Sequence, residues 1–330
     1  MKAFEYASPR TEREVLELLS ADRGHTEVLA GGTDLIGLMK KMIVKPDRVV
    51  SLNRVDSLKT IDANSTAVHV GAMVTLEDLA DNPICEFYPA IRQAIGEMAS
   101  QQLRAQGTVG GELCQRPRCW FFRDKRGLLA ERGRAVEEGD NRFHAIFGNS
   151  GMAKFASPSR LAPALIALDA RVRILGPNPG DETLMPLEVF YRTPKSERER
   201  EHMLEPNQFI SQVILPHPEG RVSASYEVRH GMGPEYPLVA AAASVLVSGG
   251  IVREARIVLG QVAPTPWISR EAIDAIVGLP INHETAEAAG QAAVSVASPL
   301  SHNEYKVQLT KVAVKRALLR AAGLETGGLS

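Results

Sequence analysis

The stretch Leu29-Ala30-Gly31-Gly32-Thr33-Asp34-Leu35-Ile36 decides how the first part of this chain folds. Residues 27–30 predict a short apolar strand, the paired glycines end it, and residues 33–42 predict a helix with Leu35 and Leu38 on its buried face. A turn between a strand and a helix directs successive backbone N–H groups outward, where an anion can bind them. Glycine lets the backbone come close to such an anion without a Cβ clash. The stretch therefore predicts an anion site built from backbone donors.

A second glycine-rich turn, Thr108-Val109-Gly110-Gly111-Glu112, follows a helix predicted at residues 88–100. Two such turns from different parts of one domain are suited to hold the pyrophosphate of a dinucleotide between them. Neither turn has the Gly-x-Gly-x-x-Gly pattern or the Walker pattern, and either glycine pair alone also fits a plain turn without a ligand. Thr33 adds a hydroxyl donor, whereas the Asp34 carboxylate repels phosphate unless it caps the helix or meets a ribose hydroxyl.

The candidate binding residues are the members of these two turns. They are Ala30, Gly31, Gly32, Thr33, Asp34, Leu35, Thr108, Val109, Gly110, Gly111 and Glu112.

The composition sets limits on the class of protein. With 330 residues, 44% hydrophobic and 23% charged, the chain is long enough for two folded domains. A net charge of −1 gives no global attraction to nucleic acid or to an anionic membrane. No run of about 18 apolar residues predicts a membrane span, and the N-terminus lacks the order of a signal peptide. We therefore expect a cytoplasmic protein without a membrane span and without a nucleic-acid partner.

The cysteines and histidines predict no metal site. Cys85, Cys114 and Cys119 are too few and too unevenly spaced for a disulfide framework or a four-cysteine cluster. The eight histidines show no metal-ligand spacing.

Along the rest of the chain, Thr11 and Thr75 are the predicted caps of two helices. The charged residues 194–201 predict a solvated surface loop. We place the boundary between two domains at residues 216–220, so that residues 1–220 form the first domain and 221–330 the second. In the second domain we expect strands at 223–228 and 257–261, a small-residue helix at 238–247 between them, and a last helix at 303–322.

Residues 114–149 form a long basic excursion with little apolar periodicity. Loops of this length are uncommon unless they serve a function or a partner. Within it, Trp120, Phe121 and Phe122 stand beside arginines, which fits either a partner surface or a locally folded loop core.

Several collinear motifs together resemble a known family. They are the first glycine turn, Gly71-Ala72 before Thr75, the second glycine turn, Ala164-Leu165-Ile166-Ala167-Leu168-Asp169-Ala170, and the C-terminal motifs at residues 263–267 and 299–307. This order is similar to the FAD-binding medium subunit of molybdenum-containing hydroxylases, a group that includes carbon monoxide dehydrogenase, xanthine dehydrogenase and the aldehyde oxidoreductases. The resemblance covers nearly the whole chain.

The resemblance implies an α+β fold, with a two-lobed FAD-binding domain of the vanillyl-alcohol-oxidase type followed by a smaller α/β C-terminal domain. It implies that the two glycine turns hold the FAD phosphates. It also implies a flavoprotein component of an oxidoreductase, which receives electrons from a small subunit with [2Fe–2S] clusters and passes them to an external acceptor. A large subunit would hold the molybdenum cofactor. The chain shows no acid–base or nucleophile set of its own, so the redox chemistry would belong to the cofactor. A partner with a twin-arginine signal would make the complex periplasmic.

The chain departs from this family at three places. The excursion resembles the loop of aldehyde oxidoreductase and hydroxybenzoyl-CoA reductase flavoprotein subunits, where four cysteines hold a [4Fe–4S] cluster, but here only Cys119 stands at a ligand position, and we expect no cluster. Glu112 replaces the usual Asn or Asp, and Arg160 replaces a common Asp. Arg160 either faces the flavin or marks a site that has changed. The alternatives are a flavin-free scaffold subunit of such a complex and a free-standing flavin oxidase.

Overall fold

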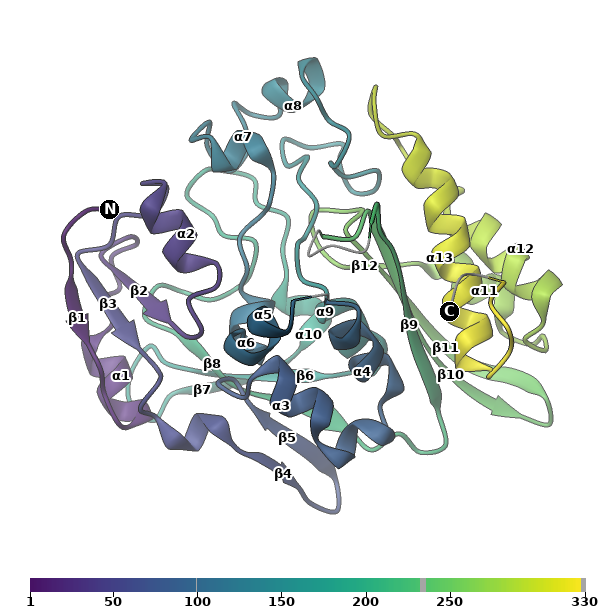
Figure 1. The fold of residues 1–330 in the computed structure, drawn as a ribbon, viewed down its shortest axis with the longest axis horizontal. Coiled ribbons are helices and arrows are strands. Elements are labelled where there is room, and N and C mark those ends of the chain that lie inside the picture. The colour runs from purple at the N-terminus through teal and green to yellow at the C-terminus, as the bar shows by residue number, and fades with distance from the viewer. Residues whose placement is uncertain (99, 232–235, 328–330) are drawn as a thin grey trace.

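The first lobe is built on a parallel sheet with the strand order β1-β3-β2 (Figure 1). The computed structural model describes residues 1–98, 100–231 and 236–327, and within these residues the chain forms three sheets. The elements of the first lobe are β1 (Glu5–Ala7), α1 (Glu12–Leu18), β2 (Thr26–Leu29), α2 (Leu35–Lys40) and β3 (Arg48–Ser51). Thr11 caps α1 as predicted, because its side chain accepts a hydrogen bond from the Glu14 N–H.

The second lobe is a five-stranded antiparallel sheet in the order β4-β5-β8-β6-β7. Its strands are β4 (Ile61–Ala63), β5 (Ala67–Gly71), β6 (Arg171–Leu175), β7 (Glu182–Pro186) and β8 (Phe209–Pro216). Its helices are α3 (Leu76–Asp81), α4 (Pro89–Gly96), α5 (Gln101–Gln106), α6 (Val109–Leu113), α9 (Ala162–Ala167) and α10 (Leu187–Phe190), with 3-10 turns at Asp56–Lys59 and Pro83–Glu86. The predicted cap at Thr75 is confirmed.

Strand β8 connects distant parts of the chain. It pairs with β5 on one side and β6 on the other, so residues after 200 return to lie beside β5, which precedes them by well over a hundred positions. The main core lies between this sheet and helices α4 and α9, and includes Ile91, Leu165 and Val213. This return brings residues 200–210 against the first lobe.

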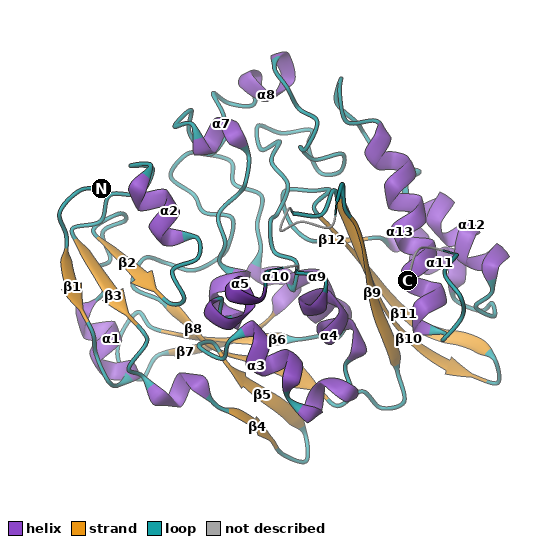
Figure 2. Ribbon diagram, viewed as in Figure 1, coloured by secondary structure: helices purple, strands orange, loops and turns teal. Residues whose placement is uncertain are grey.

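The C-terminal part is a four-stranded antiparallel sheet, β12-β11-β10-β9. Its elements are β9 (Val222–Val228), β10 (Val239–Ser248), β11 (Ile251–Gly260), β12 (Trp267–Ile268), α11 (Arg270–Ile276), α12 (His283–Ala293) and α13 (Tyr305–Ala321). Figures 1 and 2 show α11, α12 and α13 together beyond this sheet. Helices α4 and α9 of the second lobe pack against β9 and β10.

The prediction of a helix at residues 238–247 is wrong, because this segment is strand β10. Strand β10 lies between β9 and β11 and pairs with both in antiparallel register. Its alanines, Ala240–Ala243, are buried because helices pack on both faces of the sheet. Small side chains allow helices to pack closely on both faces of a strand. Because both faces of β10 are buried, its sequence lacks the apolar–polar alternation that would have indicated a strand.

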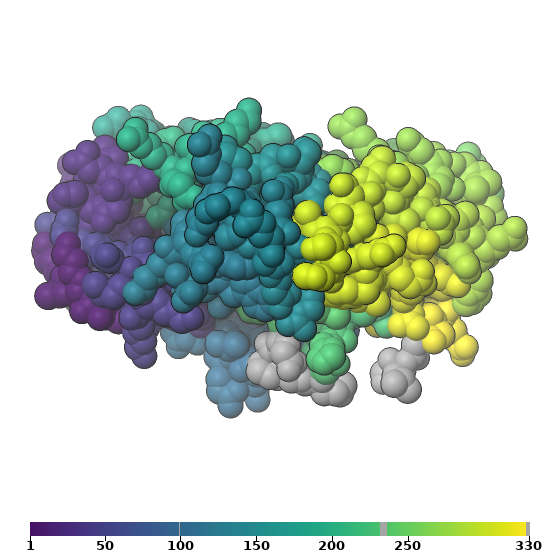
Figure 3. Space-filling view, turned by 90° about the horizontal axis from the view of Figure 1, so that it is seen from above, coloured from purple at the N-terminus to yellow at the C-terminus, as the bar shows by residue number. Residues whose placement is uncertain are grey.

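The basic excursion folds locally and contains α7 (Trp120–Arg123) and α8 (Arg134–Glu138). Phe122, Leu128 and Leu129 pack with Leu38 of α2, and a second small cluster gathers Ala130, Ala135 and Val136 around Phe121 and Cys119. Seen from above, this teal segment covers the middle of the molecule, between the purple N-terminal lobe and the yellow helix α13 (Figure 3). The aromatic residues at 121 and 122 therefore contribute to a loop core.

Of the helices in the described residues, none combines the length and apolarity that a membrane crossing needs.

Candidate functional site

The two glycine turns meet at one pocket, with a volume of about 180 Å³, between the first and second lobes. The first turn enters it at the end of β2, and the second at the start of α6. Most of the predicted binding residues line this pocket: Ala30, Gly31, Gly32, Thr33, Asp34, Leu35, Thr108, Gly110 and Gly111. Val109 and Glu112 do not line it, since Val109 is fully buried in the core and Glu112 is buried behind the turn.

The glycines of the turns are required by contacts within the protein. A Cβ on Gly31 would lie 1.9 Å from the carbonyl oxygen of Gln106, and a Cβ on Gly110 would lie 2.8 Å from the Cβ of Ala72. The Gln106 side-chain Nε2 also donates to the Gly31 carbonyl at 3.0 Å. Gly32 has φ +73°, a conformation that favours glycine. Gly31 thus allows the first turn to contact the backbone at Gln106, and Gly110 allows the second turn to approach Ala72, in addition to any contact with a ligand.

The two turns differ in the state of their backbone donors. Within the part of the chain that the structure describes, the N–H groups of Gly32, Thr33 and Asp34 donate to no protein acceptor. In the second turn, Val109 donates to the Val74 carbonyl and Gly110 to the Ala72 carbonyl, both at 2.9 Å. Only the first turn therefore offers its row of N–H groups to a ligand.

The second turn is closed further by Thr108. Its hydroxyl accepts from the Gly111 N–H at 3.2 Å and caps α6. The hydroxyl of Thr108 still has its own proton to donate toward the pocket that it lines.

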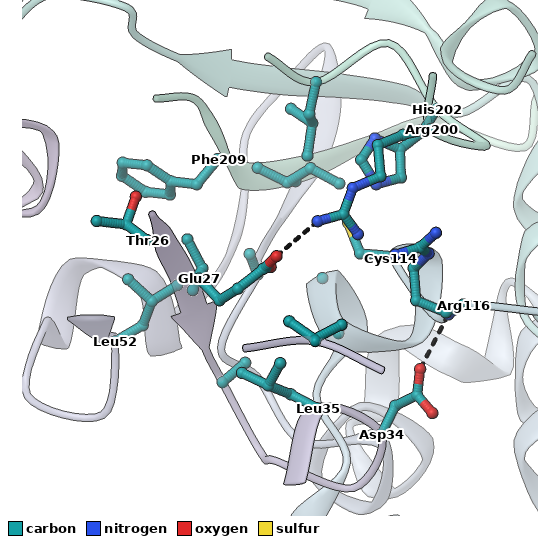
Figure 4. Close-up of a pocket in the computed structure, with 18 of the residues that line it drawn as sticks. Thr26, Glu27, Asp34, Leu35, Leu52, Cys114, Arg116, Arg200, His202 and Phe209 are labelled. Atoms are coloured by element: carbon teal, nitrogen blue, oxygen red, sulfur yellow. Dashed lines mark hydrogen bonds and ion pairs between the residues drawn. The ribbon is translucent and has the colours of Figure 1, made fainter. Parts of the chain in front are cut away.

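Asp34 is turned toward the basic excursion and does not cap α2. Its carboxylate accepts from the Arg116 N–H at 2.9 Å (Figure 4). It also accepts from the Arg123 guanidinium at 2.9 Å, and Arg118 lies 3.6 Å away. These donors neutralise the carboxylate that would otherwise repel a phosphate in the same pocket.

The wall opposite the turns comes from residues 200–210, which the sequence interpretation did not identify as part of the site. Arg200 pairs with Glu27 of β2 at 2.6 Å (Figure 4), and Arg116 pairs with Glu201 at 2.9 Å. The expectation of a solvated loop at 194–201 is wrong at its C-terminal end, because Glu201 is buried. The alternating glutamates and arginines of residues 197–201 did not indicate which of them would form ion pairs with distant parts of the chain.

Two titratable side chains beside this wall, His202 and Cys114, are uncharged. Burial, followed by the nearby arginines, holds the pKa of His202 well below 6.5, and its ring stacks on Phe190 with centroids 5.4 Å apart. Burial raises the pKa of Cys114 to about 12. Apolar side chains complete the pocket, among them Leu52, Phe209 and Ile210.

Arg160 does not line the pocket. Its guanidinium forms a buried ion pair with Glu227 of β9, with Nε to Oε1 at 2.9 Å, and donates to the Glu97 carbonyl at 2.6 Å. Its backbone N–H donates to Glu112 Oε1 at 2.7 Å. Burial raises the pKa of Glu112 to about 7. Arg160 therefore joins the second lobe to the C-terminal sheet.

Cys119 lies against His144, with Sγ and Nε2 3.1 Å apart, and the Phe121 and His144 ring centroids are 5.7 Å apart. Burial raises the pKa of Cys119 and lowers that of His144 to about 4, so both groups are neutral. The described residues contain no group of three or more side chains of the kind that could hold a metal ion.

Comparisons with known proteins cover nearly the whole chain. Residues 2–218 match the family model described as FAD binding domain in molybdopterin dehydrogenase, and residues 224–321 match the CO dehydrogenase flavoprotein C-terminal domain. The chain is 33% identical to the aldehyde oxidoreductase FAD-binding subunit PaoB of Escherichia coli, over 97% of this chain and 99% of that protein. It is 26% identical to the carbon monoxide dehydrogenase medium chain of Hydrogenophaga pseudoflava, over 96% of both chains.

The fold also matches solved structures. A chain of the Cu,Mo-CO dehydrogenase in its cyanide-inactivated form superposes with a TM-score of 0.77 at 23% identity, covering 98% of this chain and 99% of that one. A chain of quinoline 2-oxidoreductase from Pseudomonas putida 86 gives a TM-score of 0.76 at 24% identity, with the same coverage. These likenesses confirm the predicted fold class.

Proposed function

Since this chain belongs to the FAD-binding medium subunits of the molybdenum hydroxylase family, we propose that it carries electrons between the [2Fe–2S] clusters of a small subunit and an external acceptor. The observation that carries the proposal is the pocket in which the two predicted glycine turns meet. The chain is an oxidoreductase subunit, and its part in the reaction is to hold and orient the flavin.

The residues of the pocket fit an FAD. The N–H groups of Gly32, Thr33 and Asp34 are unengaged within the described chain and form a row suited to pyrophosphate oxygens. The hydroxyls of Thr33 and Thr108 add donors from either side of the pocket. The apolar wall suits the flat ring systems of a dinucleotide. When bound, FAD supplies both one-electron and two-electron redox chemistry.

The charged side chains of the pocket are arranged to leave room for the negative charge of the pyrophosphate. Asp34 and Glu27 are each paired with an arginine, at 2.9 and 2.6 Å. The neutral thiol of Cys114 and the neutral ring of His202 add no charge to the wall. These residues bind the cofactor and exclude water, and they take no part in proton transfer.

The partners and place in the cell follow from the family only as proposals. We propose a heterotrimer with a large molybdopterin-binding subunit and a small [2Fe–2S] subunit, because the relatives are subunits and medium chains of such enzymes. We retain the cytoplasm as the location, residue 220 as the domain boundary and the absence of a [4Fe–4S] cluster as proposals.

The test is to purify the intact complex, denature it, and identify any released flavin by its absorption spectrum and by chromatography against FAD and FMN. We expect one FAD per copy of this chain. An intact complex that transfers electrons but releases no flavin would overturn the proposal in favour of a flavin-free scaffold. The engaged N–H groups of Val109 and Gly110 favour that rival. Turnover by a stable, isolated chain would instead identify a free-standing flavin oxidase.

A further inference from the structure

A second cavity, of about 380 Å³, lies where the basic excursion meets the C-terminal part of the chain. Its walls include Trp120 of α7, Phe143 and His144 of the excursion, Gln261 just after β11, and Lys306 of α13. It adjoins the flavin pocket through one short segment, because Cys114 and Arg116 line the first pocket and Arg118 and Cys119 line the second. The proposed function does not use this cavity.

Lys306 brings a buried amine into the cavity wall. The residue is 1% exposed, and Nζ donates to the carbonyls of Gln261 at 2.8 Å and Phe143 at 3.2 Å. An ammonium has three N–H groups, so these carbonyls leave one for another acceptor. Among the described residues no carboxylate lies within 4.0 Å of Nζ, although buried charges in proteins are normally paired. Lys306 thus lacks the counter-ion that a buried cation needs.

Two further buried polar atoms of the same wall have no partner in the described chain. They are Oε1 of Gln261 and Nδ1 of His144, whose residues are 4% and 1% exposed. Buried side-chain polar atoms are paired in the large majority of cases. An acceptor without a partner, a ring nitrogen without a hydrogen bond and an uncompensated amine thus belong to residues of one cavity wall, which marks this cavity as a candidate ligand site.

The rest of the lining defines the class of that ligand. Arg118 is a second cationic side chain in the lining, although it lies 3.6 Å from Asp34 and donates to the Tyr236 hydroxyl, and no Asp or Glu lines the cavity among the described residues. Trp120 and Phe143 provide flat apolar walls, with ring centroids 5.5 Å apart at an interplanar angle of 72°. A cationic end and aromatic walls match an anion with a flat apolar body.

We propose that this cavity binds a small aromatic carboxylate, whose carboxylate accepts a hydrogen bond from Lys306 Nζ while its ring lies against Trp120 and Phe143. The ligand supplies the missing counter-ion of Lys306. Burial lowers the pKa of Lys306 to about 7, and a bound carboxylate favours its ammonium form.

The experiment titrates benzoate into the full-length chain and follows binding by calorimetry and tryptophan fluorescence. The chain has two tryptophans, so a Trp267→Phe background leaves Trp120 as the reporter in the cavity wall. We expect saturable binding of benzoate, at least tenfold weaker binding of the neutral analogue benzyl alcohol, and at least tenfold weaker binding of sulfate. Equal binding of the three probes, or no saturable binding of benzoate, would overturn the proposal.

Variants separate a ligand-binding Lys306 from a structural one. Lys306→Met is expected to weaken benzoate at least tenfold, whereas Lys315→Met, which breaks only an exposed pair with Glu287 on the same helix α13, leaves it unchanged. Because Lys306→Met risks misfolding, Ala156→Phe provides an independent variant that fills the cavity and keeps the lysine. Unchanged benzoate affinity in either folded cavity variant would contradict the assignment. The FAD content measured in parallel tests the proposed function separately.

Discussion

Replacing Arg160 by methionine is expected to destabilise the chain by about 3–5 kcal/mol, because the Glu227 carboxylate then remains buried without a cation. The two side chains are 7% and 1% exposed, so water does not replace the lost partner. The guanidinium contacts Glu227 through two nitrogens and also donates to the Glu97 carbonyl, so the variant loses two bonds to the C-terminal sheet and one within the second lobe.

The assay is urea unfolding followed by far-UV circular dichroism at pH 7, with flavin content measured on the same samples. The double variant Arg160→Met/Glu227→Leu removes both charges and is expected to recover most of the loss, since an apolar pair of similar volume is often as stable as a buried ion pair. The matched control is Arg13→Met, which breaks an exposed pair within α1 and should leave the free energy of unfolding unchanged within the error of the measurement.

A specific result would refute this reasoning. If Arg160→Met lowered the flavin content while the free energy of unfolding stayed within about 1 kcal/mol of the wild type, Arg160 would act on the pocket and not on the contact between the domains.

Three further predictions use other parts of the structure. Gly31→Ala is expected to destabilise the fold by at least about 1–3 kcal/mol and to lower flavin content, because its Cβ would collide with the Gln106 carbonyl. The control Gly37→Ala, on the open face of α2, should stabilise the fold by about 0.5–1 kcal/mol, and urea unfolding measures both variants. Burial raises the pKa of Glu112 in the folded protein to about 7 from 4.5, so between these pH values the folded protein retains a proton that the unfolded chain releases. The wild type should therefore lose about 3 kcal/mol of unfolding free energy relative to Glu112→Gln as the pH rises from 4.5 to 7. A stability difference that does not change with pH would contradict this. Burial lowers the pKa of Lys306 in the folded protein to about 7 from 10.5, so between these pH values the unfolded chain binds one proton more than the folded protein. The ligand-free wild type should therefore gain stability relative to Lys306→Met as the pH rises from 7 to 10. Thermal unfolding of both proteins across that range should show the stability difference shift in favour of the wild type.

The local features of the chain could be predicted from the sequence because they depend on neighbours. Thr11 and Thr75 cap helices with N–H groups three residues away. The glycine pairs end strands or begin helices through their own backbone geometry. The order of these motifs along the chain was enough to identify the family.

Features that depend on distant partners could not be predicted in the same way. Residues 238–247 have a composition that suits a helix, and only pairing with β9 and β11 makes them strand β10. Arg160 was expected to face the flavin or to mark a changed site, and its partner Glu227 lies 67 positions away on another sheet. No sequence pattern indicates which of many carboxylates a buried arginine will meet.

The sequence alone therefore determined the two glycine turns, the strand–turn–helix unit and the class of fold, since these follow from short-range geometry and collinear motifs. Only the tertiary structure decided which N–H groups remain available, because Val74 and Ala72 accept those of the second turn and leave the first turn to the ligand. It also decided that residues 200–210 complete the pocket and that Lys306 is buried without a carboxylate among the described residues. Burial and pairing are set by contacts between segments far apart in the chain, and the order of residues does not specify them.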